Sequence, residues 1–132
     1  MKKLVVLLPV ALMFAGCFNQ ERNCADFKTG KFRSEIIIDG EKKVTDFTRD
    51  DKYEIETFEG KTDTTAVRWI NDCEFILEKE NPKNAAERKG IHMKILTTKG
   101  NTYTFEFSLV GDTQKQKGTV TKPVSYTHLT LP

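Results

Sequence analysis

"TYTFEFSLV", residues 102–110, alternates large apolar side chains with polar ones more regularly than any other stretch of this 132-residue chain. Tyr103, Phe105, Phe107 and Leu109 fall on one side of an extended backbone, and small or charged residues fall on the other. This period of two is the pattern of a β-strand with one buried face. The stretch therefore predicts a strand that contributes aromatic side chains to a core.

Runs of the same kind recur on both sides of this strand, from Phe27 to Lys122, and short turn signals separate them. Asp39-Gly40 and Asn71-Asp72 are two of these signals, and each predicts a tight hairpin. The residues expected to face inward in the earlier strands are Phe32, Ser34, Ile36, Ile38, Tyr53, Ile55, Thr57, Thr65, Val67, Trp69, Cys73, Phe75 and Leu77.

Seven or eight short strands joined mostly by hairpins predict a mainly β fold, an antiparallel meander. Such a sheet hides its edges best by curling into a small barrel, and a twisted open sheet is the alternative. Asn81-Pro82 and Gly90 bracket one short helix near 82–89. "FKTGKF", residues 27–32, resembles the glycine-x-aromatic start of lipocalin-like barrels, with Phe32 where tryptophan is usual.

The N-terminus has the parts of an export signal. A positive start at Lys2 and Lys3 precedes an apolar run from Leu4 to Phe14. That run is too short to span a bilayer, which takes about 20 residues. Its end, Phe14-Ala15-Gly16-Cys17, resembles the lipobox of bacterial lipoproteins, in which the cysteine carries acyl chains such as palmitate. The alternative is an ordinary secreted protein cut near Ala15-Gly16.

The three cysteines fit this interpretation. Lipidation of Cys17 leaves Cys24 and Cys73 as one pair, which an oxidising envelope compartment would join. Closing a loop of about 50 residues adds roughly 4 kcal/mol in the chain-entropy model. The alternative is two buried free thiols.

These features divide the chain into a signal peptide (1–16), a tether (17–23), one β domain (24–122) and a tail (123–132). The tail, "PVSYTHLTLP", loses all alternation and resembles translated sequencing-adapter DNA. The alternative is a genuine disordered tail.

Composition excludes some classes of function. The net charge of +2 is spread over 21 basic and 19 acidic residues, so no nucleic-acid footprint is expected. His92 is expected at the surface, and no catalytic group, metal site or cofactor is predicted. Glu54, Glu56 and Glu59 are expected on an exposed strand face, and the Asp46, Asp50 and Asp51 cluster on a solvated turn.

The aromatic side chains either fill the barrel or line an apolar cup for a small ligand. In the second case the candidate lining residues are Tyr53, Arg68, Trp69, Tyr103 and Phe105, with Arg68 or the tyrosine hydroxyls at the mouth.

Taken together, "CADFKTGKF", "YEIETFEGKTDT", "RWINDCEFIL" and "HMKILTT" resemble a family of small bacterial envelope lipoproteins without an assigned activity. Some of its members carry the label DNA topoisomerase IV, which an exported domain of about 105 residues cannot justify. The resemblance implies a location in the envelope and a domain, not a reaction. The lipobox, the paired cysteines and the aromatic-rich strands without catalytic groups predict an anchored, non-enzymatic domain at the outer membrane facing the periplasm, with surface exposure left open. Its partner would be a small apolar ligand or an envelope protein. An envelope enzyme, an enzyme inhibitor and a purely structural role are the alternatives.

Overall fold

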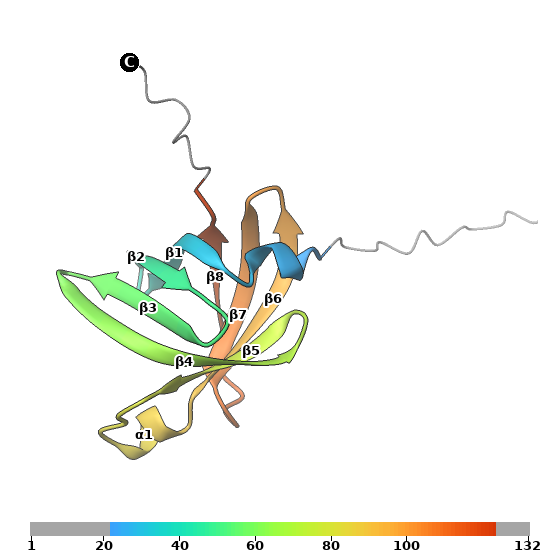
Figure 1. Ribbon diagram of the computed structural model, residues 1–132. Coiled ribbons are helices and arrows are strands. Elements are labelled where there is room, and N and C mark those ends of the chain that lie inside the picture. The colour runs from blue at the N-terminus through green and yellow to red at the C-terminus, as the bar shows by residue number, and fades with distance from the viewer. Residues whose placement is uncertain (1–21, 124–132) are drawn as a thin grey trace, which may run out of the picture.

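The computed structural model describes residues 22–123 as a closed barrel of eight antiparallel strands (Figure 1). Each strand pairs with the next along the chain, and β1 pairs with β8 to complete the circle. The prediction of a mainly β meander is therefore confirmed, in its barrel form. The signal peptide, Cys17, most of the tether and residues 124–132 of the tail lie outside the described residues.

The strands are short, as the turn signals indicate. They are β1 (Gly30–Ile38), β2 (Glu41–Arg49), β3 (Tyr53–Phe58), β4 (Lys61–Asn71), β5 (Glu74–Lys79), β6 (Ile91–Lys99), β7 (Thr102–Leu109) and β8 (Gln116–Thr121). Asp39 and Gly40 both have positive φ, as the two central residues of the tightest hairpin turn require. The helix expected near 82–89 is a single turn, α1 (Ala85–Arg88), which Asn84 caps by accepting from the Glu87 amide.

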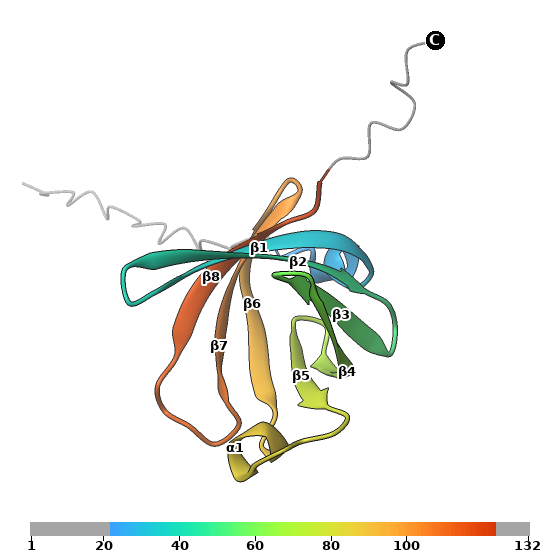
Figure 2. The same cartoon turned by 90° about the vertical axis from the view of Figure 1, so that its left-hand side faces the viewer.

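The two ends of the barrel differ. A 3₁₀ turn, η1 (Cys24–Phe27), lies at one end, and α1 lies at the other (Figures 1 and 2). The predicted disulfide between Cys24 and Cys73 is present and ties η1 to the turn between β4 and β5. Cys24 and Phe27 are buried, so η1 plugs its end of the barrel. We call the opposite end the α1 end.

The core is aromatic and fills the half of the barrel near η1. Tyr103 and Phe105 are buried, as the alternation of β7 predicts, while Phe107 is only partly covered. Phe105 lies opposite Gly118 on β8, where a Cβ atom would approach the ring to 2.7 Å. Glycine at this position therefore leaves the space that the Phe105 ring occupies.

Candidate functional site

The strand β3 has the opposite orientation to the one its apolar residues predict. Tyr53 and Ile55 are each 39% exposed on the outer face, while Glu54 is 3% exposed inside the barrel. The expectations of an inward Tyr53, Ile55 and Thr57 and of an exposed Glu54 are therefore wrong. The expectation of an inward Ile38 is also wrong, because this last residue of β1 is exposed beside the hairpin turn. Because side chains alternate along a strand, placing Glu54 inside also turns Glu56 toward the interior.

The hairpin between β2 and β3 explains this reversal. The Asp50 side chain accepts hydrogen bonds from the backbone amides of Lys52 and Tyr53, at 2.8 and 2.7 Å. This Asx turn sets the pairing in which Arg49 faces Glu54 and Phe47 faces Glu56. Asp50 thus belongs to a structured turn, and one buried cation determines which face of β3 points inward.

Arg49 is the centre of a fully satisfied polar network. Its side chain is 0% exposed, and its Nε donates to the Glu54 carboxylate at 3.2 Å. The Nη1 group donates to the Phe27 carbonyl at 2.7 Å, and Nη2 donates to the Tyr103 hydroxyl at 3.1 Å. Buried charges are tolerated in proteins when they are paired in this way. The network links β2, β3, β7 and η1.

Aromatic rings surround the same guanidinium. Its central carbon lies 4.5 Å from the ring centre of Phe75, 5.0 Å from that of Phe32 and 5.2 Å from that of Phe47. Cation–π attraction of this kind strengthens when water is excluded. Arg49 therefore occupies the place that a cationic ligand would take in an aromatic cage, and it closes the barrel interior at the η1 end.

Glu56 has a different environment from Glu54. Burial and the nearby carboxyl groups of Glu54 and Asp63 together raise the pKa of Glu56 to about 7, although the Lys79 ammonium opposes the rise. The protonated form is also favoured by a hydrogen bond to Glu54, in which Glu56 is the donor. Burial raises the pKa of Glu54 as well, but the Arg49 guanidinium opposes that rise. Glu56 is thus a carboxyl group that titrates near neutral pH.

Glu56 lies where two cavities meet. The inner one, of about 120 Å³, is bounded mostly by apolar side chains, including Ile36, Met93 and Phe107. The outer one, of about 210 Å³, opens between α1 and the barrel and includes Asp63, Lys79, Glu87 and Leu109. Glu56, Leu77 and Ile91 line both cavities. The α1 end is therefore hollow where the η1 end is filled.

The five side chains predicted to line a cup do not gather at one site. Tyr103 and Phe105 border the inner cavity, whereas Trp69 packs against Phe75 in the η1 half of the barrel. Arg68 lies on the outer face of β4 and pairs with Glu78 at 3.0 Å. Tyr53 also faces outward, because Glu54 takes the inward position beside it.

Sequence reasoning missed Arg49, Glu54 and Glu56 as inward groups. The available signal was the pair of opposite charges on the two sides of the turn at residues 50–52, directly across the predicted hairpin. His92 lies on β6 with its Nε2 atom 3.4 Å from Glu74, and both are partly exposed. Within residues 22–123 no three His, Cys, Asp or Glu side chains are grouped as metal ligands would be.

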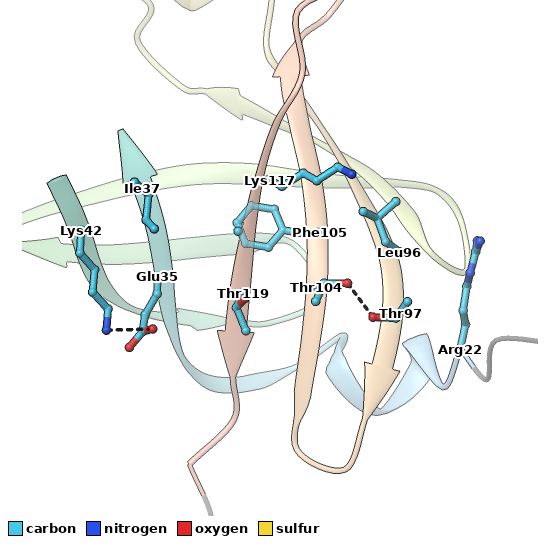
Figure 3. Close-up of a pocket in the computed structure, with 11 residues that line it drawn as sticks. Arg22, Glu35, Ile37, Lys42, Leu96, Thr97, Thr104, Phe105, Lys117 and Thr119 are labelled. Atoms are coloured by element: carbon cyan, nitrogen blue, oxygen red, sulfur yellow. Dashed lines mark hydrogen bonds and ion pairs between the residues drawn. The ribbon is translucent and has the colours of Figure 1, made fainter. Parts of the chain in front are cut away.

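A wider hollow of about 750 Å³ lies on the outer wall, across β1, β8, β7 and β6 (Figure 3). Four of its polar side chains pair with one another: Lys42 with Glu35 at 3.3 Å, and Thr97 with Thr104 at 2.6 Å. Phe105 borders both this hollow and the inner cavity. We take the cavity at the α1 end as the candidate site, because it continues into the barrel interior and contains the buried carboxyl group of Glu56.

Comparison with protein-family models, curated proteins and solved structures finds no match for this chain. In the described part of the chain, no helix has the length and apolar character needed to cross a bilayer. Function must therefore be inferred from the residues and the geometry of the barrel.

Proposed function

We propose that this chain is a lipid-anchored protein of a bacterial envelope whose barrel is a non-catalytic domain that binds a small ligand at the α1 end. The observation that carries the proposal is the pair of cavities joined at Glu56, in a barrel that is otherwise filled. A domain with a purely structural role needs no such hollow, because small barrels ordinarily fill their interior with side chains.

The size of the cavity limits the ligand. At the roughly 30 Å³ that one water molecule occupies, a cavity of about 210 Å³ holds about seven non-hydrogen atoms. A long fatty acyl chain is more than twice that size, and Arg49 with its aromatic neighbours blocks further entry toward η1. A small amphipathic molecule fits better than a membrane lipid.

The position of the anchor agrees with a ligand site at the α1 end. Only residues 18–21 separate Cys17 from Arg22, and the described chain enters the barrel through η1. At about 3.5 Å per residue, a lipid on Cys17 would keep the η1 end within a short distance of the bilayer. The α1 end, on the far side of the barrel (Figure 2), would then face the aqueous compartment.

The outer membrane, facing the periplasm, is the proposed location. Phe18 follows Cys17, so the chain lacks an aspartate of the kind that retains some lipoproteins at the inner membrane. Cys17→Ala tests the anchor. We expect the variant to leave the membrane fraction and to lose the mass of the acyl chains, which intact-protein mass spectrometry measures. A variant that stays with membranes at unchanged lipid mass would contradict the anchor.

Ligand binding is tested separately, with the Cys17→Ala chain in its disulfide-bonded form. Small amphipathic molecules should shift the methyl NMR signals of Leu77 and Ile91 and leave those of Ile70, which is exposed on β4 and lines neither cavity, unchanged. A titration series in which no compound moves the Leu77 and Ile91 signals would remove the binding role and leave the anchor as a separate question.

A further inference from the structure

The charges around the α1-end cavity do not cancel. Lys79 is the one cation among its lining residues, and it is already shared between Asp63, at 3.7 Å, and Glu87, at 3.3 Å. Deeper in the barrel, Glu54 is paired with Arg49. Among residues 22–123, no lysine, arginine or histidine forms an ion pair with Glu56. The Glu56 carboxyl group, at the junction of the two cavities, therefore has a carboxyl neighbour, and the only cation among these residues that lowers its pKa is Lys79, which is already paired with two other carboxyl groups.

The remaining lining is apolar. Leu77, Ile91 and Leu109 form one wall of the outer cavity, and Ile36 and Phe107 continue that surface into the inner cavity. A ligand that enters from α1 meets carboxyl groups first and hydrocarbon beside them. It can bury a short alkyl or aryl group against this wall while a polar group stays near Glu56.

Resting on the binding role proposed above, we infer that the α1-end cavity takes a small organic cation, an ammonium group on a short hydrocarbon, with the ammonium placed at Glu56. The charge of the cavity lining favours an ammonium compound over an anion or an alcohol of the same size. An anion of the same size would meet the carboxyl groups of Glu56, Asp63 and Glu87, and only Lys79 would attract it. A neutral alcohol would gain no charge–charge attraction from these carboxyl groups.

The protonation of Glu56 also supports an ammonium ligand. Without ligand, Glu56 holds its proton up to about pH 7, because it is buried near other carboxyl groups. A bound ammonium would favour the ionised form, so binding should release a proton near neutral pH. The charged groups that face Glu56 are Glu54, Arg49, Asp63, Lys79 and Glu87, and the first two neutralise each other.

The test compares three probes of nearly equal size: n-hexylammonium, n-hexanol and hexanoate, titrated to about 10 mM against the Cys17→Ala chain. We expect n-hexylammonium to bind about tenfold more tightly than either of the others, with methyl shifts at Leu77 and Ile91. Its affinity should fall about tenfold between about pH 8 and pH 5.5, as Glu56 becomes protonated.

Glu56→Gln keeps the shape and removes the charge, and it should lower the affinity for n-hexylammonium about tenfold while leaving n-hexanol unchanged. Glu78→Gln is the matched control, because Glu78 lies on the outer face of β5, two strands away from Glu56, and pairs with Arg68. Equal or tighter binding of hexanol or hexanoate would overturn the cation class but keep the binding role. Absence of binding for all three probes would overturn both.

Discussion

Arg49 and Glu54 form an ion pair inside the barrel, with 0% and 4% of their side chains exposed. The two residues lie opposite each other across the β2–β3 hairpin, at the point where the interior changes from filled to hollow. On the η1 side Arg49 completes a plug of aromatic rings, and on the α1 side Glu54 contacts Glu56 at the cavity. The Arg49–Glu54 ion pair thus connects the filled η1 half of the barrel to the candidate site.

Breaking this pair should cost most of the stability of the domain. Arg49→Met leaves Glu54 buried without its partner, which we expect to lower the free energy of unfolding by about 3–5 kcal/mol. Urea unfolding followed by Trp69 fluorescence measures the change. Arg33→Met is the control, since Arg33 and Asp46 pair on the exposed outer face, and it should leave the midpoint almost unchanged. Equal midpoints for the two variants would contradict the role given to Arg49.

Glu56 should make the barrel less stable as pH rises. Its pKa in the fold is about 7, above the ordinary value of 4.5, so the folded state holds this proton more tightly than the unfolded chain does. The resulting stabilisation is complete below about pH 4.5 and is lost as pH rises toward 7.

Glu56→Gln isolates this effect, since the amide can still donate to Glu54. We expect the variant to be about 1–2 kcal/mol more stable than the parent near pH 8, less than the full shift would give because Glu56 keeps some contact with solvent. Near pH 5 the two proteins should unfold at the same urea concentration. A Glu56→Gln variant that is less stable than the parent near pH 8 would show that Glu56 is ionised and favourably paired in the fold.

The disulfide should contribute a large share of the stability. Cys24 and Cys73 are 49 residues apart, and opening a loop of that length should cost about 4 kcal/mol in the chain-entropy model. Thermal melts with and without dithiothreitol measure the difference. The double variant Cys24→Ala/Cys73→Ala should melt at the temperature of the reduced protein and should not respond to the reductant. A parent protein that also fails to respond would contradict this contribution.

Gly118→Ala should disturb the aromatic core from the opposite strand. A methyl group there would lie 2.7 Å from the Phe105 ring and 2.9 Å from the Glu35 carbonyl oxygen, so the ring and β1 must both move. We expect a loss of about 1–3 kcal/mol, measured by urea unfolding. Thr119→Ala, one residue further along β8, is the control and should have a much smaller effect. Adding Phe105→Leu to Gly118→Ala should cost less than the two single changes added together.

Most of the fold could be predicted from the sequence, because period-two alternation reports directly which face of a strand is buried. In β1, β4 and β5, Phe32, Val67 and Leu77 face inward as that pattern predicts. The hairpin signals then fix the order of the strands, and the barrel follows because β8 can pair with β1 and leave no open edge.

The candidate site could not be predicted in the same way. In β3 the apolar pattern points to Tyr53 and Ile55, yet their partner strand presents the buried guanidinium of Arg49, and a carboxylate must face it. Patterns of hydrophobicity treat both charges as surface residues, since each alone would be costly to bury. The burial of Arg49 and Glu54 becomes favourable only because the two residues pair across the turn. That pairing depends on the register between β2 and β3, which patterns of hydrophobicity do not report.

The disulfide at Cys24 has a mechanical consequence under the N-terminal anchor proposed above. A pull arriving through Asn23 reaches the covalent bridge to Cys73 before it reaches Gly30, where the first strand begins. Tension therefore passes into the middle of the chain, at the bend between β4 and β5, and the seam between β1 and β8 is not peeled open one hydrogen bond at a time. Unfolding from the N-terminal end, strand by strand, would first require the bond between Cys24 and Cys73 to be reduced.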